Sequence, residues 1–370
     1  MWRTIIGAAA AIFAAGLLYI SFRAANFNFI KKISGGRRWL ARVICLAFFA
    51  ALTALLWLTM NMMNALVCII HLVVFWLLCD LAALIISKIS KKTPARSIAG
   101  TAAIVLCTVW LAVGWYNDHH VRTTEYSFDT GKINSDIRIV QITDTHIGET
   151  FHADGFEKII ERINALSPDA VVITGDFVDD DTSRDDMLGA CAALGKLRAD
   201  CGVFFVFGNH DRGYYSESSK GWTNTLLREN LLENGVVILE DEAELTSGGF
   251  YVAGRKDRSS GGSTNARKTA EELLSGLDRS RYIIILDHQP HDFDGEAQAG
   301  ADLVLCGHTH GGQFIPINHV GEWMGENALR YGHEKRLDTD FIVSSGVSNW
   351  AFRFKTGCFS EIVVIDLKAR

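Results

Sequence analysis

The positions of apolar side chains divide the chain into two parts with different periodicity. In the first part, four long stretches are almost wholly apolar, at about 4–22, 39–60, 65–86 and 98–116. Each approaches the ~20 residues that an α-helix needs to cross a bilayer. Helices buried in a soluble core would keep a polar face, and these stretches leave almost none. The pattern therefore predicts a membrane region with four transmembrane helices over residues 1–117.

Basic side chains between these stretches indicate how the helices cross the membrane. They gather between the first and second stretches and between the third and fourth, at Arg23, Lys31, Lys32, Arg37, Arg38, Lys88, Lys91, Lys92 and Arg96. Because basic loops stay in the cytoplasm, both chain ends and the remainder of the chain are predicted to be extracytoplasmic. A cleaved signal peptide over the first stretch, followed by Ala24 and Ala25, is the competing interpretation and would invert this arrangement.

After residue 117, short apolar runs alternate with amphipathic helical stretches. Helices are expected at 156–166, 187–198 and 222–234, and strands at 136–143, 170–174, 203–207, 250–253, 282–286, 302–306, 341–343 and 362–365. This alternation predicts sheets covered by helices, and hence an α/β domain over residues 118–370. Ligands in such folds gather beyond the carboxyl ends of the strands.

Composition adds limits to this picture. The chain has 370 residues, more than one average domain, and a formal net charge of -6. This mildly acidic balance argues against nucleic acid as a partner, because nucleic acid calls for a basic face. Four cysteines fall in the second part, at Cys191, Cys201, Cys306 and Cys358. Disulfides and reduced burial are both compatible with them, and Cys191–Cys201 is the pair nearest in sequence.

Five of the predicted strands end in clusters of carboxylate, amide and imidazole side chains. The clusters are Asp144-Thr145-His146, Gly175-Asp176-Phe177-Val178-Asp179, Gly208-Asn209-His210-Asp211, Asp287-His288-Gln289-Pro290 and Gly307-His308-Thr309-His310-Gly311-Gly312. Ser and Pro would serve equally well in ordinary turns. Extended residues two apart point to the same side, so the Asp-x-His and the His-x-His pairs can each aim both side chains at one locus.

These residue types fit a site for two divalent metal ions, with Mn, Fe and Zn as candidates. Carboxylate and amide oxygens with imidazole nitrogens suit borderline divalent ions, and no thiolate is among them. A carboxylate such as Asp176 can place one oxygen on each ion and hold the pair ~3.5–4 Å apart. Asn209 contributes a neutral oxygen, which limits the negative charge and leaves attraction for an anionic substrate.

In this order, Asp144-x-His146, Gly175-Asp176-x-x-Asp179, Gly208-Asn209-His210-Asp211, His288 and Gly307-His308-x-His310 resemble the signature of the calcineurin-like metallophosphoesterases. The resemblance spans about 137–367, and the membrane helices make the chain most similar to the membrane-anchored, YkuE-like branch. It implies a four-layer αββα sandwich, in which two mixed sheets pack face to face with helices outside.

The resemblance also implies roles for individual residues. One ion would be held by Asp144, His146 and His310, the other by Asn209, His288 and His308, and Asp176 would bridge them. His210 would contact the phosphoryl group or protonate the leaving oxygen, and Asp211 would orient His210. Asp179 would act behind the ligands or as a structural residue.

The implied activity is hydrolysis of a phosphate ester or diphosphate by a metal-bridging hydroxide. The membrane region suggests that the substrate is lipid-linked or envelope-associated and that the bilayer is a partner. Two alternatives stay open: a UDP-2,3-diacylglucosamine-type diphosphate hydrolase, and a non-catalytic metal-binding membrane sensor. Late aromatic and apolar residues could form a wall for acyl chains, although core packing is their commoner fate; these are Trp323, Met324, Trp350, Phe352 and Phe354.

Overall fold

A computed structural model describes residues 2–91, 96–213, 217–260 and 267–370 of the chain. The chain forms two compact units, Met1–Val113 and Gly114–Arg370. Helix α5 begins in the first unit, and its last turns belong to the second. The units are described in turn.

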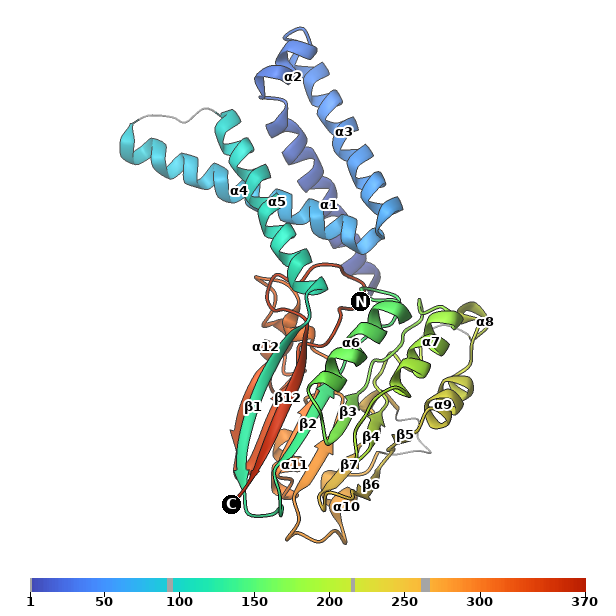
Figure 1. The fold of residues 1–370 in the computed structure, drawn as a ribbon. Coiled ribbons are helices and arrows are strands. Elements are labelled where there is room, and N and C mark those ends of the chain that lie inside the picture. The colour runs from blue at the N-terminus through green and yellow to red at the C-terminus, as the bar shows by residue number, and fades with distance from the viewer. Residues whose placement is uncertain (1, 92–95, 214–216, 261–266) are drawn as a thin grey trace. The chain divides into compact units, whose positions relative to one another are not determined.

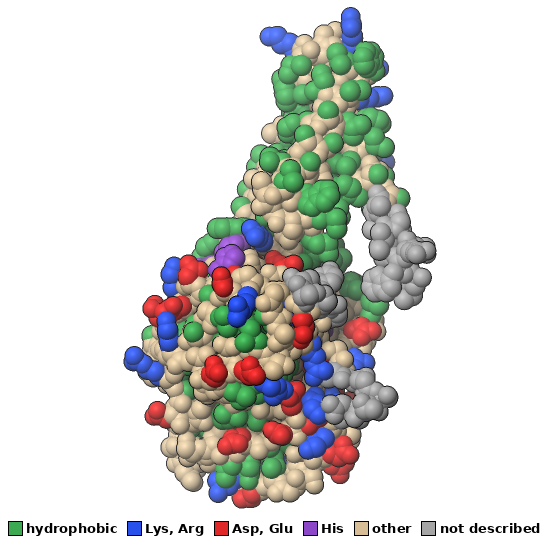
Figure 2. Space-filling view, turned by 90° about the vertical axis from the view of Figure 1, so that its right-hand side faces the viewer, with side chains coloured by type: hydrophobic (Ala, Val, Ile, Leu, Met, Phe, Trp, Pro, Cys, Tyr) green, Lys and Arg blue, Asp and Glu red, His purple; other side chains and the backbone are tan. Residues whose placement is uncertain are grey.

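The first unit is helical. It contains α1 (Trp2–Ala24), α2 (Asn28–Ile33), α3 (Arg38–Thr59), α4 (Met62–Ser90) and the beginning of α5 (Arg96–His119). Three described helices are long and apolar enough to cross a membrane: α3, α4 and Ser97–His119 of α5. Figure 2 shows apolar side chains spread over the surface of these helices. The predicted span 4–22 falls on α1, of which Ala11–Ala24 is a shorter apolar helix and the side chains of residues 2–10 lie outside the described part. A fourth span therefore stays a prediction.

An ion pair links α1 and α4. Arg23 donates to Asp80, and the Tyr19 hydroxyl donates to the same carboxylate at 2.5 Å. Buried Ile20, Phe49 and Trp76 pack in the same unit. Because a charge at membrane depth is costly alone, pairing Asp80 with two donors makes its position on α4 tolerable.

The second unit contains two six-stranded mixed sheets (Figure 1). The first has the order β1-β12-β2-β3-β4-β5, and the second β10-β11-β9-β8-β7-β6. The strands of the first are β1 (Arg122–Thr130), β2 (Ile137–Ile142), β3 (Ala170–Thr174), β4 (Val203–Val206), β5 (Val236–Ile238) and β12 (Glu361–Ala369). Those of the second are β6 (Glu242–Leu245), β7 (Tyr251–Gly254), β8 (Ile283–Leu286), β9 (Leu303–Cys306), β10 (Gly332–Arg336) and β11 (Thr339–Val343).

Parallel pairing dominates the middle of both sheets. β2, β3, β4 and β5 are parallel, as are β7, β8, β9 and β11. Their carboxyl ends therefore meet at one edge of each sheet. Strands buried on both faces read as continuous apolar runs, as Val171, Val172 and Ile173 of β3 do.

Helices cover the outer faces of both sheets and complete four layers. On the first sheet lie α6 (Ala153–Ala165), α7 (Arg184–Leu194) and α9 (Asn224–Glu233); on the second lie α10 (Ala270–Leu274) and α11 (Phe293–Gln298). Short α8 (Glu217–Lys220) and α12 (Val320–Trp323) belong to connecting segments. In α6 the buried Phe156, Ile160 and Ile163 recur at helical spacing and pack on the sheet.

Between the sheets, inward side chains of both form one core. Phe204 and Val172 of the first sheet share it with Ile284, Leu305 and Ile342 of the second. The predicted αββα sandwich is thereby confirmed. The eight cysteines are all free, so Cys191–Cys201 does not form a disulfide.

Candidate metal centre

The five polar clusters follow β2, β3 and β4 of the first sheet and β8 and β9 of the second. In each sheet these strands are neighbours, and all of them reach the site by their carboxyl ends. The loops after them carry the predicted ligands into one buried region. The sheet topology therefore brings together residues that are far apart in the sequence.

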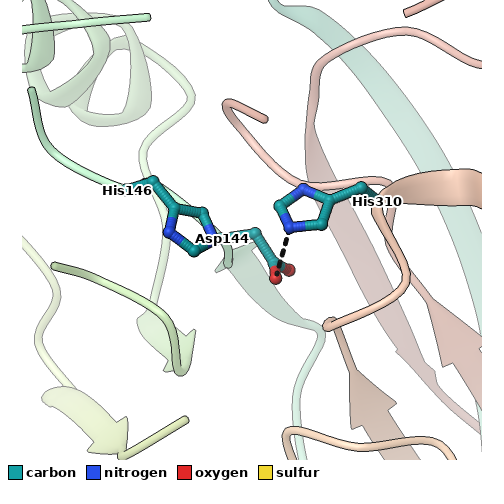
Figure 3. A group of neighbouring side chains, drawn as sticks. All are labelled: Asp144, His146 and His310. Atoms are coloured by element: carbon teal, nitrogen blue, oxygen red, sulfur yellow. Dashed lines mark ion pairs between the residues drawn. The ribbon is translucent and has the colours of Figure 1, made fainter. Parts of the chain in front are cut away.

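Two groups of side chains in this region could each hold a metal ion. In the first, Asp144, His146 and His310 each offer one ligand atom, and these atoms lie within 4.8 Å of one another (Figure 3). In the second, Asp176, His288 and His308 do the same. Asn209 belongs to the loop after β4, where the adjacent His210 amide donates to Asp176 Oδ1 at 2.8 Å.

Asp176 lies between the two groups. Its Oδ2 is 3.0 Å from His288 Nε2 in the second group and 3.8 Å from His146 Nε2 in the first. The side chain is buried, so neither contact is screened by solvent. This position is the one that a carboxylate shared by two ions would need.

The second nitrogen of three imidazoles is held by a partner outside the two groups. His146 Nδ1 is 3.1 Å from Asp179, His288 Nδ1 is 2.7 Å from the Thr174 carbonyl, and His310 Nδ1 is 3.4 Å from the Ser348 carbonyl. Such partners fix the ring orientation and tautomer of a metal-binding histidine. They direct the Nε2 atoms of these residues toward the centre.

Two buried imidazole nitrogens without hydrogen-bond partners also fit a site for metal ions. His146 Nε2 and His308 Nδ1 are buried, and neither has a hydrogen-bond partner among the described residues. A buried polar atom left without a partner costs ~1–3 kcal/mol. Two such atoms, each within a group of potential ligands, are explained by ions that would accept their lone pairs.

The backbone of the ligands is strained. Asp144, His146, Asp176, His308 and His310 all have positive φ, between 38° and 70°. Each costs on the order of 1–3 kcal/mol for a residue with a side chain, and such strain gathers at functional sites. Gly346 packs closely on one of them, since a Cβ at this glycine would lie 2.7 Å from that of Asp144.

Burial and charge set the protonation of the imidazoles. Burial lowers the pKa of His308 to about 4, and burial together with the neighbouring His146 lowers the pKa of His310 well below its usual range. Burial also acts to lower the pKa of His288, but Asp176 and Asp144 outweigh it and raise that pKa well above its usual range. Neutral imidazoles are the form that binds metals.

His210 stands beside the first group rather than in either set. Its ring centroid is 5.1 Å from that of His146 and 5.0 Å from that of Trp350. Burial lowers the pKa of His210, which favours the neutral ring. A neutral imidazole held at this point can accept or donate one proton at neutral pH.

Asp211 ties two of the ligand loops together. Its carboxylate accepts backbone N–H groups from Gly208 at 2.7 Å, Asp176 at 2.9 Å, Phe177 at 2.7 Å and Val178 at 3.0 Å. Burial and the nearby Asp176 raise its pKa to about 7 against these donors. The expectation that Asp211 orients His210 stays a prediction, and the contacts above give it a role in holding the loops.

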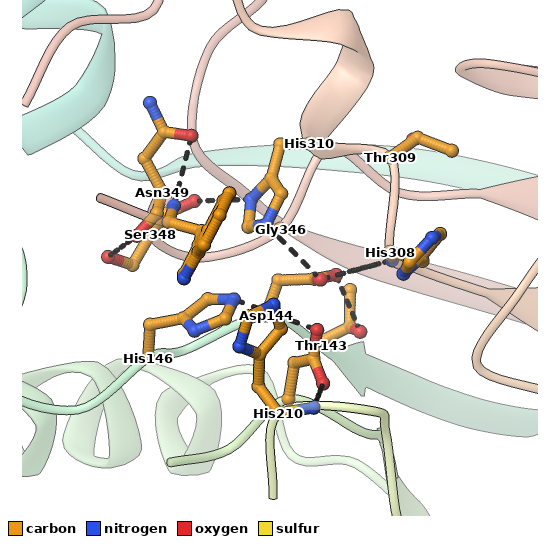
Figure 4. A network of polar contacts seen from close by, with 12 residues as sticks. Thr143, Asp144, His146, His210, His308, Thr309, His310, Gly346, Ser348 and Asn349 are labelled. Carbon is orange, nitrogen blue, oxygen red and sulfur yellow. Dashed lines mark hydrogen bonds and ion pairs between the residues drawn. The ribbon is translucent and has the colours of Figure 1, made fainter. Parts of the chain in front are cut away.

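Asp144 is held from three sides (Figure 4). Thr143 Oγ1 donates to its carboxylate at 2.8 Å, the His308 amide donates at 3.0 Å, and the Ser348 amide donates to its carbonyl at 3.1 Å. The segment after β11 that supplies Ser348 carries no metal ligand. Sequence reasoning missed it because its residues are small, polar and without periodicity.

A cavity of about 300 Å³ opens onto the centre. Asp176, His210, His308 and His310 are among the residues that line it, and so are Ile317, Asn318, Glu322, Asn327, Arg330 and Trp350. Arg330 Nη1 donates to the Gly311 carbonyl at 2.6 Å, and its amide donates to Glu322 at 2.9 Å. Arg330 is a cationic residue of the cavity lining that the sequence analysis did not identify.

Comparison with known proteins places these features in one family. The family model described as Calcineurin-like phosphoesterase matches residues 137–312. A metallophosphoesterase of Aquifex aeolicus is 33% identical over 256 residues, which are 68% of this chain and 94% of that protein. The metallophosphoesterase YkuE of Bacillus subtilis is 27% identical over 61% of this chain and 78% of its own length.

A relative from Bos taurus is called a transmembrane protein with metallophosphoesterase domain. It is 29% identical over 292 residues, which are 75% of this chain and 64% of that protein, so the chain spans less than two thirds of its length. Together with the three described helices of spanning length, this similarity supports a membrane protein.

Proposed function

Because the chain belongs to the calcineurin-like metallophosphoesterases, a family of metal-dependent hydrolases, we propose that it is a membrane-anchored enzyme that cleaves a phosphate ester or diphosphate carried by a lipid. One observation carries this proposal: two groups of buried ligands share the region around Asp176 at the base of a cavity. A site built for a single ion would not need a second complete group.

The proposed ligands follow from this geometry and from the family. Asp144, His146 and His310 would hold one ion, Asn209, His288 and His308 the other, and Asp176 both. When bound, the two ions would neutralise charge on phosphoryl oxygens and lower the pKa of water. The chain itself supplies the orientation of the ligands, through Asp179, Thr174 and Ser348.

His210 is the proposed proton donor to the leaving oxygen. It lines the cavity, and Trp350 packs against its ring at 5.0 Å and limits its rotation. A neutral imidazole can hold a proton on the nitrogen that faces the substrate and release it as the ester bond breaks. Asp211 keeps the backbone of this loop and that of Asp176 in register.

The polar residues that line the cavity in addition to the candidate ligands support a diester or diphosphate over a simple monoester. Arg330, Asn318 and Asn327 line the same cavity as the imidazoles and can donate to a second charged or polar group. The guanidinium is fixed by its bond to Gly311, so it is already oriented before a substrate arrives. The same three residues support a UDP-2,3-diacylglucosamine-type diphosphate as the alternative substrate.

The proposal places the catalytic unit outside the cytoplasm. Its support is the charge of the loops: Lys31, Lys32 and Arg38 follow the first apolar stretch, while the turn at Asn61 between α3 and α4 carries no basic residue. An envelope or lipid-linked phosphate would be accessible from that side.

Turnover by the full-length chain in lipid nanodiscs tests the proposal. With Mn²⁺ added after chelation, the wild type is expected to hydrolyse bis(p-nitrophenyl) phosphate, and Asp176→Asn to lose at least about 100-fold, since metal charge stabilisation contributes several kcal/mol. Asp129→Asn, an exposed carboxylate on edge strand β1, is the matched control and should match the wild type. Metal binding without turnover would instead favour the sensor alternative.

A further inference from the structure

The segment between the metal centre and β10 exposes apolar side chains. Ile317 is 60% exposed, Trp323 76% and Met324 70%, and Ile315 and Val320 are exposed beside them. These five residues are called the apolar rim. Among the late aromatic and apolar residues for which core packing was expected, Phe354 is buried, whereas Trp323 and Met324 are not. Contiguous exposed apolar surface marks contact with a partner or a membrane.

The apolar rim adjoins the entrance to the metal centre. Ile317, Asn318 and Glu322 of this segment line the cavity, which they share with His308 and His310. Ile317 is the rim residue in that lining, and the other four, Ile315, Val320, Trp323 and Met324, are exposed outside it. A molecule that covers the rim therefore meets the opening of the cavity.

The apolar rim also adjoins the last turns of α5, within the same compact unit. The Gly114 carbonyl accepts the Lys355 amide at 2.9 Å. Thr356, the next residue, accepts the Ile315 amide at 3.2 Å through its hydroxyl. A Cβ on Gly357 would lie 3.6 Å from Ile315 Cγ1. Residues 355–357 thus link the last turns of α5 to the rim.

Aromatic side chains mark where α5 leaves the membrane. Trp115 and Tyr116 are both about half exposed on its last turns, and Trp and Tyr gather at membrane–water interfaces. The rim presents the same kind of surface close by. Its segment, 315–324, contains one ionisable carboxylate, Glu322, which is already bound to His319 and to the Arg330 amide. Little charge would have to be desolvated there.

We propose that the apolar rim docks into the interfacial layer of the bilayer that α5 spans, and that the cavity thereby takes the phosphate headgroup of a membrane-resident amphiphile. The inference rests on the proposed phosphoesterase function for its substrate, and on the contacts of residues 355–357 for its geometry. The bilayer is the proposed occupant because residues 355–357 contact the rim at Ile315 and are hydrogen-bonded to the last turns of α5 through the Gly114 carbonyl. Acyl chains would stay in the lipid while the headgroup enters.

A fluorescent probe on the rim tests the docking without requiring turnover. Met324→Cys and, as the matched control, Leu232→Cys on α9 are each labelled with an NBD fluorophore in the full-length chain in phosphatidylcholine nanodiscs. Both positions are exposed apolar side chains. The label taken up by the eight native cysteines in the wild type is subtracted. Lipids that carry a doxyl quencher near the headgroup are then added.

The expected result is a blue-shifted emission at position 324 that the doxyl lipids quench about twofold, because interfacial segments bury ~5–10 Å into the headgroup boundary. Position 232 should stay unquenched by lipid and open to aqueous iodide. Iodide quenching at position 324 equal to that at 232 would overturn the docking. Protection that appears only in nanodiscs with two copies would also overturn it, in favour of a second chain.

Failure of the docking and failure of the proposed function are distinguishable. If bis(p-nitrophenyl) phosphate is hydrolysed but position 324 stays in water, the enzyme stands and the rim does not contact lipid. If position 324 is quenched by lipid but no phosphodiester is hydrolysed, the rim stands and the substrate argument fails. Trp323→Ser should lose the lipid quenching of a label at 324 and keep turnover of the soluble diester within about twofold, since Trp anchors at the interface.

Discussion

Asp176 and His210 are one sequence motif apart but have different tasks in the site. Asp176 contacts both ligand groups, through His288 at 3.0 Å and His146 at 3.8 Å. His210 belongs to neither group and faces the cavity. Removal of a shared ligand should therefore disturb metal content and activity together, whereas removal of His210 should separate them.

His210→Ala tests this separation. The variant is expected to retain both ions and to lose roughly 10²–10⁴ in kcat, which is the usual contribution of one acid–base group. Metal content by mass spectrometry and phosphodiester turnover are measured on the same preparation. His291→Ala, an exposed histidine after β8, is the control. Unchanged kcat with both ions present would remove His210 from the reaction.

The positions of the candidate ligands could be predicted from the sequence because each follows an apolar strand, and the family resemblance implied their individual roles. Asp144 and His308 follow β2 and β9 so closely that strand and cluster are read together. Arg330, Ser348 and Lys355 could not be predicted. They come from irregular segments after β9 and β11, whose path is set by packing against the other sheet and by no local pattern.

At the scale of elements, a capping residue explains why one helix begins earlier than the sequence pattern predicts. α7 was expected from 187 but begins at Arg184, after Ser183, whose side chain accepts the Asp186 amide. Ser is a strongly preferred N-cap residue, so the start of α7 could be predicted from the sequence. Strand β1 could not be predicted, because its residues are mostly polar and half exposed. It forms by parallel pairing with β12 over nine residues.

Lys355 connects the end of α5 to the ligand loops. Its amide donates to Gly114, and its fully buried Nζ donates to the carbonyls of Ser345 at 2.7 Å and Gly346 at 3.3 Å. Gly346 in turn packs against Asp144. Lys355, which contacts the last turns of α5, thus also supports a candidate metal ligand.

Lys355→Met keeps the length of this side chain and removes its donors. The Ser345 carbonyl would then lose its Lys355 donor, while the Gly346 carbonyl would keep the Glu361 amide at 2.9 Å. A buried acceptor left without a partner costs ~1–3 kcal/mol. The thermal midpoint in one detergent should fall by about 2–4 °C per kcal/mol for a unit of this size. Lys368→Met, on the exposed end of β12, should leave it unchanged. A midpoint equal to or above that of the wild type would contradict the role of Lys355.

At the scale of the whole molecule, the topology of the membrane helices decides from which side of the membrane a substrate reaches the site. The three described helices of spanning length support a membrane protein, and under the proposed topology the charge of the loops puts its catalytic unit outside the cytoplasm. The number of helices matters for this conclusion, because each added or removed span reverses the side on which the following residues lie.

Reporter fusions decide the orientation. Alkaline phosphatase joined after Arg370 is expected to be active, and green fluorescent protein at the same point is expected to be dark. Both results follow because the two basic loops stay in the cytoplasm, so the residues after α5 lie outside it. Fusions after Ser90, at the end of α4, should give the reverse pattern. A bright fluorescent fusion at Arg370 would support the cleaved signal peptide and a cytoplasmic site.

The convergence of seven side chains on two ions is tested most directly by metal stoichiometry. The purified full-length chain, saturated with Mn²⁺ and passed through a desalting column, is analysed by inductively coupled plasma mass spectrometry beside Asp176→Ala. The account predicts two ions per wild-type chain and a loss of both tight sites in the variant. One ion per chain that is unaffected by Asp176→Ala, or turnover that persists in the metal-free chain, would contradict it.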